Sequence, residues 1–539
     1  MRATTAAALG ATLLLTMLAA CQPASPPAAP AAFDPLAAAR AAAGRFDNRE
    51  APVVAACYTR TDGAANPCWV CHTAANGHNR ADDAHLQVRY AFSAAAHTNH
   101  WTNLFVDRRA AIAQIGDDAI LAWVRADNYT PLREQLATRR DYLGWRPDLD
   151  LRAGFDEQGF ARDGSRWRAF RYMPFPGTFW ASNGSADDVF IRLPAAFYSD
   201  ADGRYSVERY RVNLAILEAA LAVPDTLPDA QLVRRVEPLS EDVAGFDLDG
   251  DGRVGGTVDT IRGLPARYAT VAPIAVRRWL YPQGTEFLHS VRYLDPDAPD
   301  FIAARLKELR YSVKRGDYTP DALAKVYAEE RQAKAVGALP HFAGRAETGL
   351  LNEHGWQLQA FIEDAAGRLR LQTDEEHYFC MGCHSNLGVT VDQSFSFPRK
   401  RPGADGWGYQ TLAGLRPVAQ AGQREPEILA YFRRARGGDE FRANAELLAR
   451  WFPDGRLDEA AVRGADLRAL TLPSRERALA LDKAYRVLVG EQRFAAGRDA
   501  PLQPPAQVHR RLDNDETGLA ARDLVYRDGR LWLDWGDAR

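Results

Sequence analysis

Two short cysteine–histidine motifs constrain this chain more than any other feature of its sequence. Residues 68–72 read CWVCH, and residues 380–384 read CMGCH. C-x-x-C-H is the motif at which c-type haem is attached. Two thiols at this spacing reach the two vinyl groups of one porphyrin, and the adjacent imidazole ligates its iron. We therefore predict two covalently bound c-type haems. The predicted attachment residues are Cys68, Cys71, Cys380 and Cys383, and the predicted proximal iron ligands are His72 and His384.

Other uses of paired cysteines fit the sequence less well. A zinc site built from two CxxC pairs does not need a histidine after each pair, and the two pairs stand far apart for such a site. A redox CxxC requires a strand before it and a helix after it. Both remain alternatives to haem attachment.

The first residues predict export and lipidation. Residues 1–20 place one arginine before an apolar run that is too short to cross a membrane and ends Leu-Ala-Ala before Cys21. This ending resembles the lipobox of bacterial lipoproteins, in which the chain is cut before the cysteine and its thiol is diacylated. The resemblance implies a membrane anchor at Cys21. Gln22 follows instead of aspartate, which favours the outer over the inner membrane. Residues 21–33 continue as a Pro/Ala-rich linker.

The sixth ligand of each iron has several candidates. The mature chain contains only Met173 and Met381, and Met381 lies inside an attachment motif. We favour His100 as a distal ligand, with His97 or His85 as alternatives. For the second haem the alternatives, none of them favoured, are His341, His354 and His377. Cys57 is left over after the lipid and haem cysteines, and it is interpreted as a small buried residue, a thiolate ligand or part of an intermolecular disulfide.

Residues 247–252 read DLDGDG, which matches the first half of an EF-hand loop. Oxygens at positions 1, 3 and 5 surround a hard cation, and glycine at position 6 permits the sharp turn. Position 12 is Val258 instead of glutamate, and Asp259 is a possible substitute. We predict a structural Ca²⁺ loop; an acidic turn that binds nothing is the alternative. Its predicted ligands are Asp247, Asp249, Asp251 and, through its carbonyl, Arg253.

Two charged segments flank the second motif. Arg399, Lys400 and Arg401 are candidate donors to haem propionates or form a solvated turn. Glu375 and Glu376 are candidate acid–base groups if peroxide chemistry occurs, or simply a solvated acidic pair.

The chain resembles bacterial dihaem c-type cytochromes at its two motifs. It is also more distantly similar to the dihaem cytochrome c peroxidase and MauG group, because both combine two haems with a calcium site between them. The spacing of the two motifs differs from that of this group. The resemblance implies electron transfer between envelope redox partners. It also leaves open an oxidoreductase, peroxidase-like or oxygenase, with one open haem, or a haem-containing sensor or assembly protein.

The expected fold is mainly α with β-hairpin insertions, in which a long α+β segment separates two cytochrome-c-like haem modules. Pro299–Lys314 and Pro320–Val336 each begin with proline and predict helices. Residues 356–372 predict a hairpin about Gly367, and a terminal hairpin is expected at Asp528-Gly529. The expected divisions are a signal peptide (1–20), a linker (21–33), a first haem module (34–150), a middle segment (151–340), a second haem module (341–420) and a helical C-terminal segment (421–539).

Length and charge narrow the function further. The chain has 539 residues and a formal net charge of −3. It therefore lacks the strong positive charge that is typical of nucleic-acid-binding proteins. We therefore expect no nucleic-acid partner. Two minimal c-type modules of about 100 residues each leave more than half of the chain to build a pocket or a docking surface. The sequence predicts a periplasm-facing lipoprotein that transfers electrons through two haems.

Overall fold

The computed structural model describes residues 33–44, 50, 52–60, 68–72, 74–75, 87–223, 227–338, 341–385, 391–435, 444–519 and 533–536. The chain divides into two compact units, Met1–Asp34 and Pro35–Arg539, and everything below concerns the second. The predicted signal peptide, Cys21 and the terminal hairpin at Asp528-Gly529 lie outside the described residues. The predicted boundaries at 150, 340 and 420 stay predictions.

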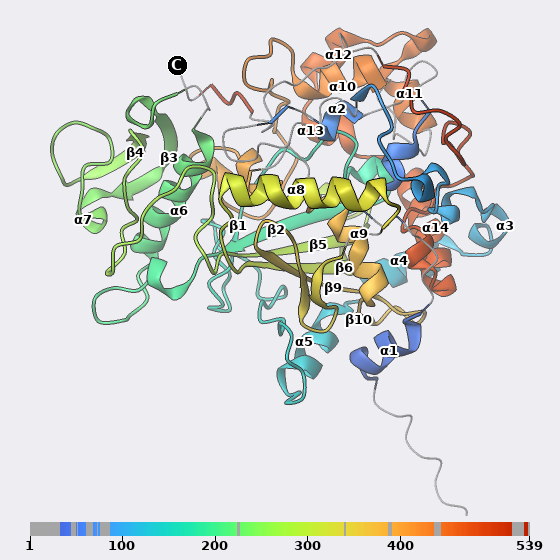
Figure 1. Cartoon of the computed structure of the whole chain (residues 1–539), viewed down its shortest axis with the longest axis horizontal. Coiled ribbons are helices and arrows are strands. Elements are labelled where there is room, and N and C mark those ends of the chain that lie inside the picture. Colours follow the sequence, from blue (N-terminus) through green and yellow to red (C-terminus); the bar gives the residue numbers. More distant parts are fainter. Residues whose placement is uncertain are drawn as a thin grey trace, which may run out of the picture. The chain divides into compact units, whose positions relative to one another are not determined.

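An antiparallel sheet of eight strands lies at the centre of this unit (Figure 1). Its strands follow the order β1-β2-β5-β6-β9-β8-β7, and β10 also pairs with β9. In that order the strands are β1 (Arg168–Ala169), β2 (Ala186–Arg192), β5 (Glu286–Leu294), β6 (Ile302–Lys314), β9 (Trp356–Glu363), β8 (Gly349–Leu351) and β7 (Ala343–Arg345), with β10 at Leu369–Leu371.

Both faces of this sheet are buried, because alternate side chains along each strand point to opposite sides. Phe287 on β5 packs into a cluster with residues of α6 (Val207–Ala222), whereas the next residue, Leu288, packs into a second cluster. That second cluster contains residues of α1 (Pro35–Ala42) and α5 (Tyr129–Ala137). Helices therefore cover the sheet on both sides, and polar side chains on its strands are held in the interior.

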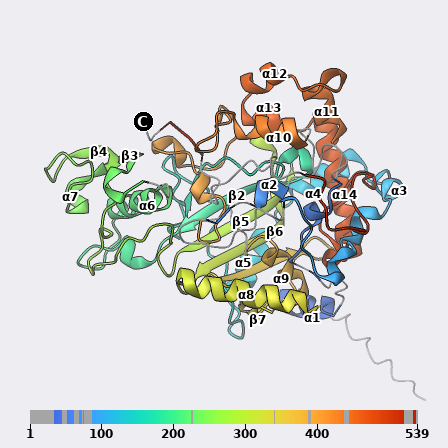
Figure 2. The same cartoon turned by 45° about the horizontal axis from the view of Figure 1, so that its top comes forward.

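Three further groups of elements surround the sheet (Figure 2). β3 (Val233–Ser240) and β4 (Thr257–Arg262) form a separate ribbon beside α6, with α7 (Glu241–Ala244). The long helix α14 (Arg475–Glu491) packs on α3 (Arg109–Ile112) and α4 (Asp117–Arg125). The third group consists of α10 (Glu427–Ala435), α11 (Ala445–Trp451), α12 (Glu459–Gly464) and α13 (Leu467–Thr471).

Local sequence signals explain where several helices begin. Thr319 caps α8 (Pro320–Ala335), whose proline sits in the first turn, as the sequence predicted. Thr373 and Glu376 form a reciprocal capping box at the start of α9 (Asp374–Met381). The predicted hairpin about Gly367 is present as β9 and β10, and Gly367 has the positive φ of +82° that the turn requires.

The predicted fold class is wrong. The protein is not mainly α with cytochrome-like modules, because a large antiparallel sheet forms its centre. The clearest difference is Pro299–Lys314, where a helix was expected: Pro299–Phe301 is a single 3₁₀ turn, and β6 follows it. β6 pairs with β5 on one side and β9 on the other. These long-range pairings override the helical pattern that the segment shows by itself.

Candidate haem and cation sites

Both cysteine motifs fold as one helical turn. α2 (Cys68–Cys71) is closed by the amide of His72, which donates to the Cys68 carbonyl at 2.8 Å. At the end of α9 the amide of His384 donates to the Cys380 carbonyl at 3.0 Å in the same way. Residues at positions i, i+3 and i+4 of a helix share one face. Each motif therefore directs its two thiols and its imidazole to one side.

The second motif is held firmly between the sheet and the N-terminal segment. His377 of α9 accepts a hydrogen bond at Nε2 from the Ala360 amide of β9 at 2.9 Å. Burial lowers the pKa of His377 to about 4, so its ring is neutral. A Cβ at Gly382 would lie 2.6 Å from the Pro52 carbonyl oxygen, so this motif position tolerates no side chain without movement.

His384 has the environment of a metal-ligating imidazole. Its Nδ1–H donates to the Gln393 carbonyl at 3.1 Å, and its ring lies edge-on to Phe395 with 5.0 Å between centroids. Burial lowers the pKa of His384 to about 4, and the charge of Arg310 adds to the lowering. Among the described residues Nε2 has no hydrogen-bond partner. A neutral imidazole with one nitrogen fixed by a carbonyl offers the other nitrogen to a metal.

The cysteines of the two motifs do not form a joint zinc site. The five cysteines within the described residues form no disulfide, and burial raises the pKa of Cys383 to about 12, so its thiol is protonated. Among the residues that the structure describes, only one acidic trio has its ligand atoms close enough together to hold an ion. The sulfurs of the two motifs are therefore not gathered around one centre.

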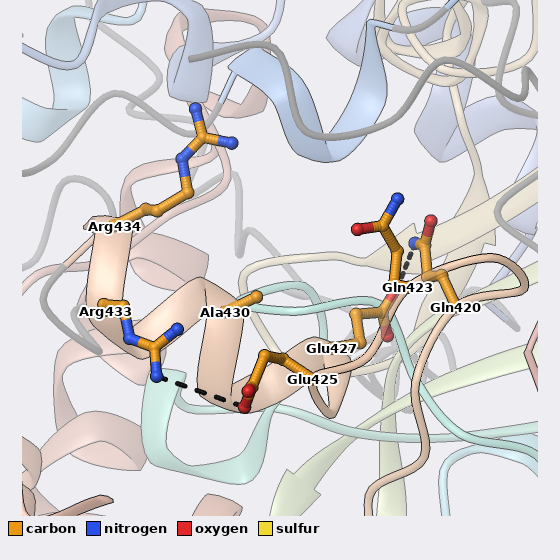
Figure 3. Close-up of a pocket in the computed structure, with 7 residues that line it drawn as sticks. All are labelled: Gln420, Gln423, Glu425, Glu427, Ala430, Arg433 and Arg434. Carbon is orange, nitrogen blue, oxygen red and sulfur yellow. Dashed lines mark hydrogen bonds and ion pairs between the residues drawn. The ribbon is translucent and has the colours of Figure 1, made fainter. Parts of the chain in front are cut away.

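The first motif packs against α10. Trp69 lies 5.9 Å from the Tyr431 ring, and the Arg434 guanidinium lies 4.6 Å above the centre of the Trp69 ring. Arg434 also faces a pocket of about 190 Å³ along α10 (Figure 3). The pocket is lined by Gln420, Gln423, Glu425, Glu427, Ala430, Arg433 and Arg434. A mixed-charge pocket thus adjoins the helix against which the first motif packs.

One hydrophobic cluster connects the two motifs, although they are far apart in the sequence. Trp69 and Val70 are buried in this cluster together with Met173. Cys71 and Phe395 both pack against it, and Phe395 contacts the ring of His384. The fold therefore gathers the two motifs around shared apolar side chains. Met173 stays a candidate ligand on the side of the first motif.

The predicted distal histidines have other contacts. His100 Nε2 bonds to the Ala95 carbonyl at 2.9 Å, and the adjacent Trp101 contacts Phe379 of α9, so this segment borders the second motif. His97 lies 3.7 Å from a carboxylate oxygen of Asp515. His85 lies outside the described residues.

The alternatives for the second haem are placed differently. His354 Nε2 bonds to the Tyr327 hydroxyl at 2.7 Å and lies 3.3 Å from Gln393 Nε2. His354 and His384 thus both contact Gln393, His354 through the side-chain amide and His384 through the backbone carbonyl. His377 is bound to β9, and His341 is exposed.

The charged residues near the second motif belong to ion pairs, a helix cap or a backbone hydrogen bond. The Arg399 guanidinium pairs with Glu427, and Lys400 pairs with Glu218 at 2.8 Å. Arg401 pairs with Asp405 at the surface. Of the predicted acid–base candidates, Glu376 completes the α9 cap and binds Arg370, while Glu375 accepts a hydrogen bond from the Gly44 amide.

A polar group on the sheet face below α9 has no local signal in the sequence. His289 on β5 stands directly opposite Arg310 on β6. His289 Nε2 lies 3.1 Å from Asp187 Oδ2, which also accepts a hydrogen bond from the Tyr172 hydroxyl at 2.6 Å. The Arg310 guanidinium interacts electrostatically with Cys380, Cys383 and His384. Only the pairing of strands distant in the sequence brings these side chains together.

The candidate cation site includes a residue outside the predicted loop, Glu241, that was not predicted from the sequence. The carboxylates of Asp247 and Asp249 lie with that of Glu241, each ligand atom within 4.8 Å of the others. Glu241, at the start of α7, also accepts a hydrogen bond from the Leu248 amide at 2.6 Å. Asp251 accepts from the Arg253 amide and is outside the trio. An acidic residue shortly before a DxDxDG loop is the signal that identifies Glu241.

Comparisons with known proteins identify the family. A family model described as a lipoprotein matches residues 41–451, more than half of the chain. An uncharacterised lipoprotein of Aquifex aeolicus (strain VF5) is 31% identical over 520 residues, which cover 84% of this chain and 86% of the relative. No solved structure matches the chain. No helix within the described residues is long and apolar enough to span a membrane.

These matches correct the resemblance drawn from the motifs. The assignment to the dihaem c-type cytochromes, and the more distant similarity to the peroxidase and MauG group, are wrong, because the matching family is one of lipoproteins. The prediction of a lipoprotein of the cell envelope is confirmed. This chain belongs to that lipoprotein family.

Proposed function

We propose that this lipoprotein binds two c-type haems covalently and transfers electrons through them. The observation that carries the proposal is the arrangement at His384: a helical turn presents two thiols and a neutral imidazole to one side, and Gln393 fixes the Nδ1 nitrogen of that imidazole. Bound haem supplies reversible one-electron chemistry. The same helical turn at residues 68–72 supports a second attachment.

The residues of the chain have distinct parts in this function. Cys68 and Cys71 would hold the first haem, and Cys380 and Cys383 the second. The Gln393 carbonyl keeps the proton of His384 on Nδ1, which leaves Nε2 as the ligand atom. Burial around Cys380 and the edge-on ring of Phe395 keep water from the second site.

Lipidation at Cys21 would place this redox protein at a membrane facing the periplasm, with the outer membrane favoured by Gln22. Its partners would then be redox proteins of the envelope. A lipid-anchored carrier fits the confirmed lipoprotein family.

We also propose that the loop formed by Glu241, Asp247 and Asp249 binds Ca²⁺. The three carboxylates meet within 4.8 Å, and Glu241 replaces the acid missing at position 12 of the loop. Carboxylate oxygens are the ligands that Ca²⁺ prefers. This ion would stabilise the junction of α7, β3 and β4.

A carbon monoxide experiment tests electron transfer against catalysis at an open iron. The full chain is produced in a strain that attaches c-type haem, reduced, and examined optically before and after the gas is added. An electron carrier shows reversible haem oxidation and no change with carbon monoxide. A haem that binds the gas would contradict a simple carrier and favour an oxidoreductase, and a chain without a haem spectrum would contradict the proposal itself.

A further inference from the structure

The sheet face below the second motif carries a histidine, His289, that nothing in the sequence connects with haem. It lies on β5 opposite Arg310, which lies opposite Ala360 of β9. The Ala360 amide bonds to His377 of α9, three residues before Cys380. Three neighbouring strands therefore place His289 and Arg310 on the face that α9 covers.

The His289 ring is oriented by its neighbours. Nε2 lies 3.1 Å from Asp187 Oδ2, and the same oxygen accepts the Tyr172 hydroxyl at 2.6 Å. The ring stands perpendicular to Phe179, with 5.2 Å between centroids. In the neutral tautomer whose Nε2 proton points to this carboxylate, Nδ1 is the lone-pair nitrogen. Among the described residues Nδ1 has no hydrogen-bond partner.

The face of β5 that carries His289 packs against the second motif. Phe287, two residues earlier on β5 and therefore on the same face, lies in one hydrophobic cluster with Cys380 and Met381 of α9. Arg310, cross-strand from His289, has its own pKa raised by Glu308 and by the thiols Cys380 and Cys383. The polar group and the attachment motif thus share one buried environment.

Four other candidate ligands among the described residues have contacts of their own. His377 is bound by β9, and His354 bonds to the Tyr327 hydroxyl. His100 bonds to its own turn. Met173 is buried in the cluster that contains Trp69 of the first motif.

We propose that His289 is the sixth ligand of the iron that His384 holds. This inference rests on the proposed function and deepens it at the second motif. Asp187 is then a positioning residue: its carboxylate accepts the Nε2 proton and keeps Nδ1 available, as outer-shell carboxylates do for metal-bound histidines. Two imidazole ligands keep a haem six-coordinate and lower its potential relative to a His/Met pair.

Ferric electron paramagnetic resonance of the full, haem-loaded chain tests the inference. We expect His289→Ala to convert one low-spin iron to high-spin, to let that reduced haem bind carbon monoxide, and to regain the low-spin signal with added imidazole. His509→Ala is the matched control: this histidine packs against Tyr90, is no ligand candidate, and its loss leaves the signals of both centres unchanged. Asp187→Asn keeps two low-spin irons and raises the potential of one, which checks the site in a variant that retains the ligand.

The outcomes separate this inference from the proposed function. Two bound haems with an unchanged low-spin signal in His289→Ala would overturn the assignment of His289 and leave haem binding intact. A wild-type chain without haem would overturn both.

Discussion

Nδ1 of His384 donates to the carbonyl oxygen of Gln393 at 3.1 Å, and this contact determines which nitrogen of the second motif is available. Gln393 adopts a left-handed backbone with φ of 57°, and Asp392 before it has φ of 50°. Lys314 bonds to the Asp392 carboxylate, which anchors this strained turn to β6. The sheet therefore supports the histidine through the turn that fixes its proton.

Each attachment cysteine is expected to hold one thioether bond. Cys68→Ser with Cys71→Ser should leave one haem per chain, and Cys380→Ser with Cys383→Ser should leave the other one. The haem content of each double variant after denaturation measures this. Cys57→Ser is the control, because Cys57 belongs to neither motif, and it should keep both haems. Full haem content in either double variant would contradict attachment at that motif.

The buried ion pair between Arg399 and Glu427 should matter for stability. Both side chains are almost fully buried, and Arg399 also donates to the Met173 carbonyl at 2.8 Å. Arg399→Met leaves Glu427 buried without its cation, and we expect a loss of about 3–5 kcal/mol in the free energy of unfolding. Denaturant titration measures the loss.

A second variant separates the pair from the packing around it. Arg399→Met with Glu427→Leu removes both charges, so it should lose less than the single variant. If the double variant is the less stable of the two, the uncompensated charge is not the cause of the loss.

Asp482 should make the protein less stable as the pH rises. Its Oδ1 accepts the Leu294 amide at 3.1 Å in the interior, and burial raises its pKa from 3.8 to about 8. Between these two pKa values the folded chain keeps a proton that the unfolded chain has released. The contribution of Asp482 to the free energy of unfolding is therefore fully present below about pH 4 and is lost as the pH rises to about 8. Asp482→Asn removes this contribution. Its free energy of unfolding should change less than that of the wild type between these limits, and equal changes would contradict the assignment.

Calcium should stabilise the chain through Glu241, Asp247 and Asp249. An ion present at 100 times its dissociation constant adds about 2.7 kcal/mol to the free energy of unfolding. Asp247→Asn with Asp249→Asn should abolish the difference between melting curves recorded with Ca²⁺ and with a chelator. Asp259→Asn is the control, since Asp259 lies on β4 outside the trio. Stabilisation that persists in the double variant would place the ion elsewhere.

Local features of the sequence predicted local features of the structure. The motif turns, the start of α8 at Pro320, the hairpin at Gly367 and the clustering of Asp247 with Asp249 each depend on residues a few positions apart. The sheet depends on contacts across long separations instead. β2 pairs with β5 about one hundred residues later, and a segment with a helical pattern becomes β6 between two strands.

The same limit applies to the candidate site. His384 was identifiable because its partner cysteines precede it directly. His289 was not, because Asp187 and Tyr172, which orient it, are more than one hundred residues away and Arg310 faces it only through strand register. A lone histidine in an apolar strand carries no signal of its own.

The mass of the denatured wild-type chain is the most direct measure of covalent haem attachment. Thioether-linked haem stays on the chain after denaturation, whereas non-covalent haem is lost. For protein purified from a strain that attaches c-type haem, we expect the mass of the processed lipoprotein plus two haems. A processed chain that carries no haem mass would contradict this expectation.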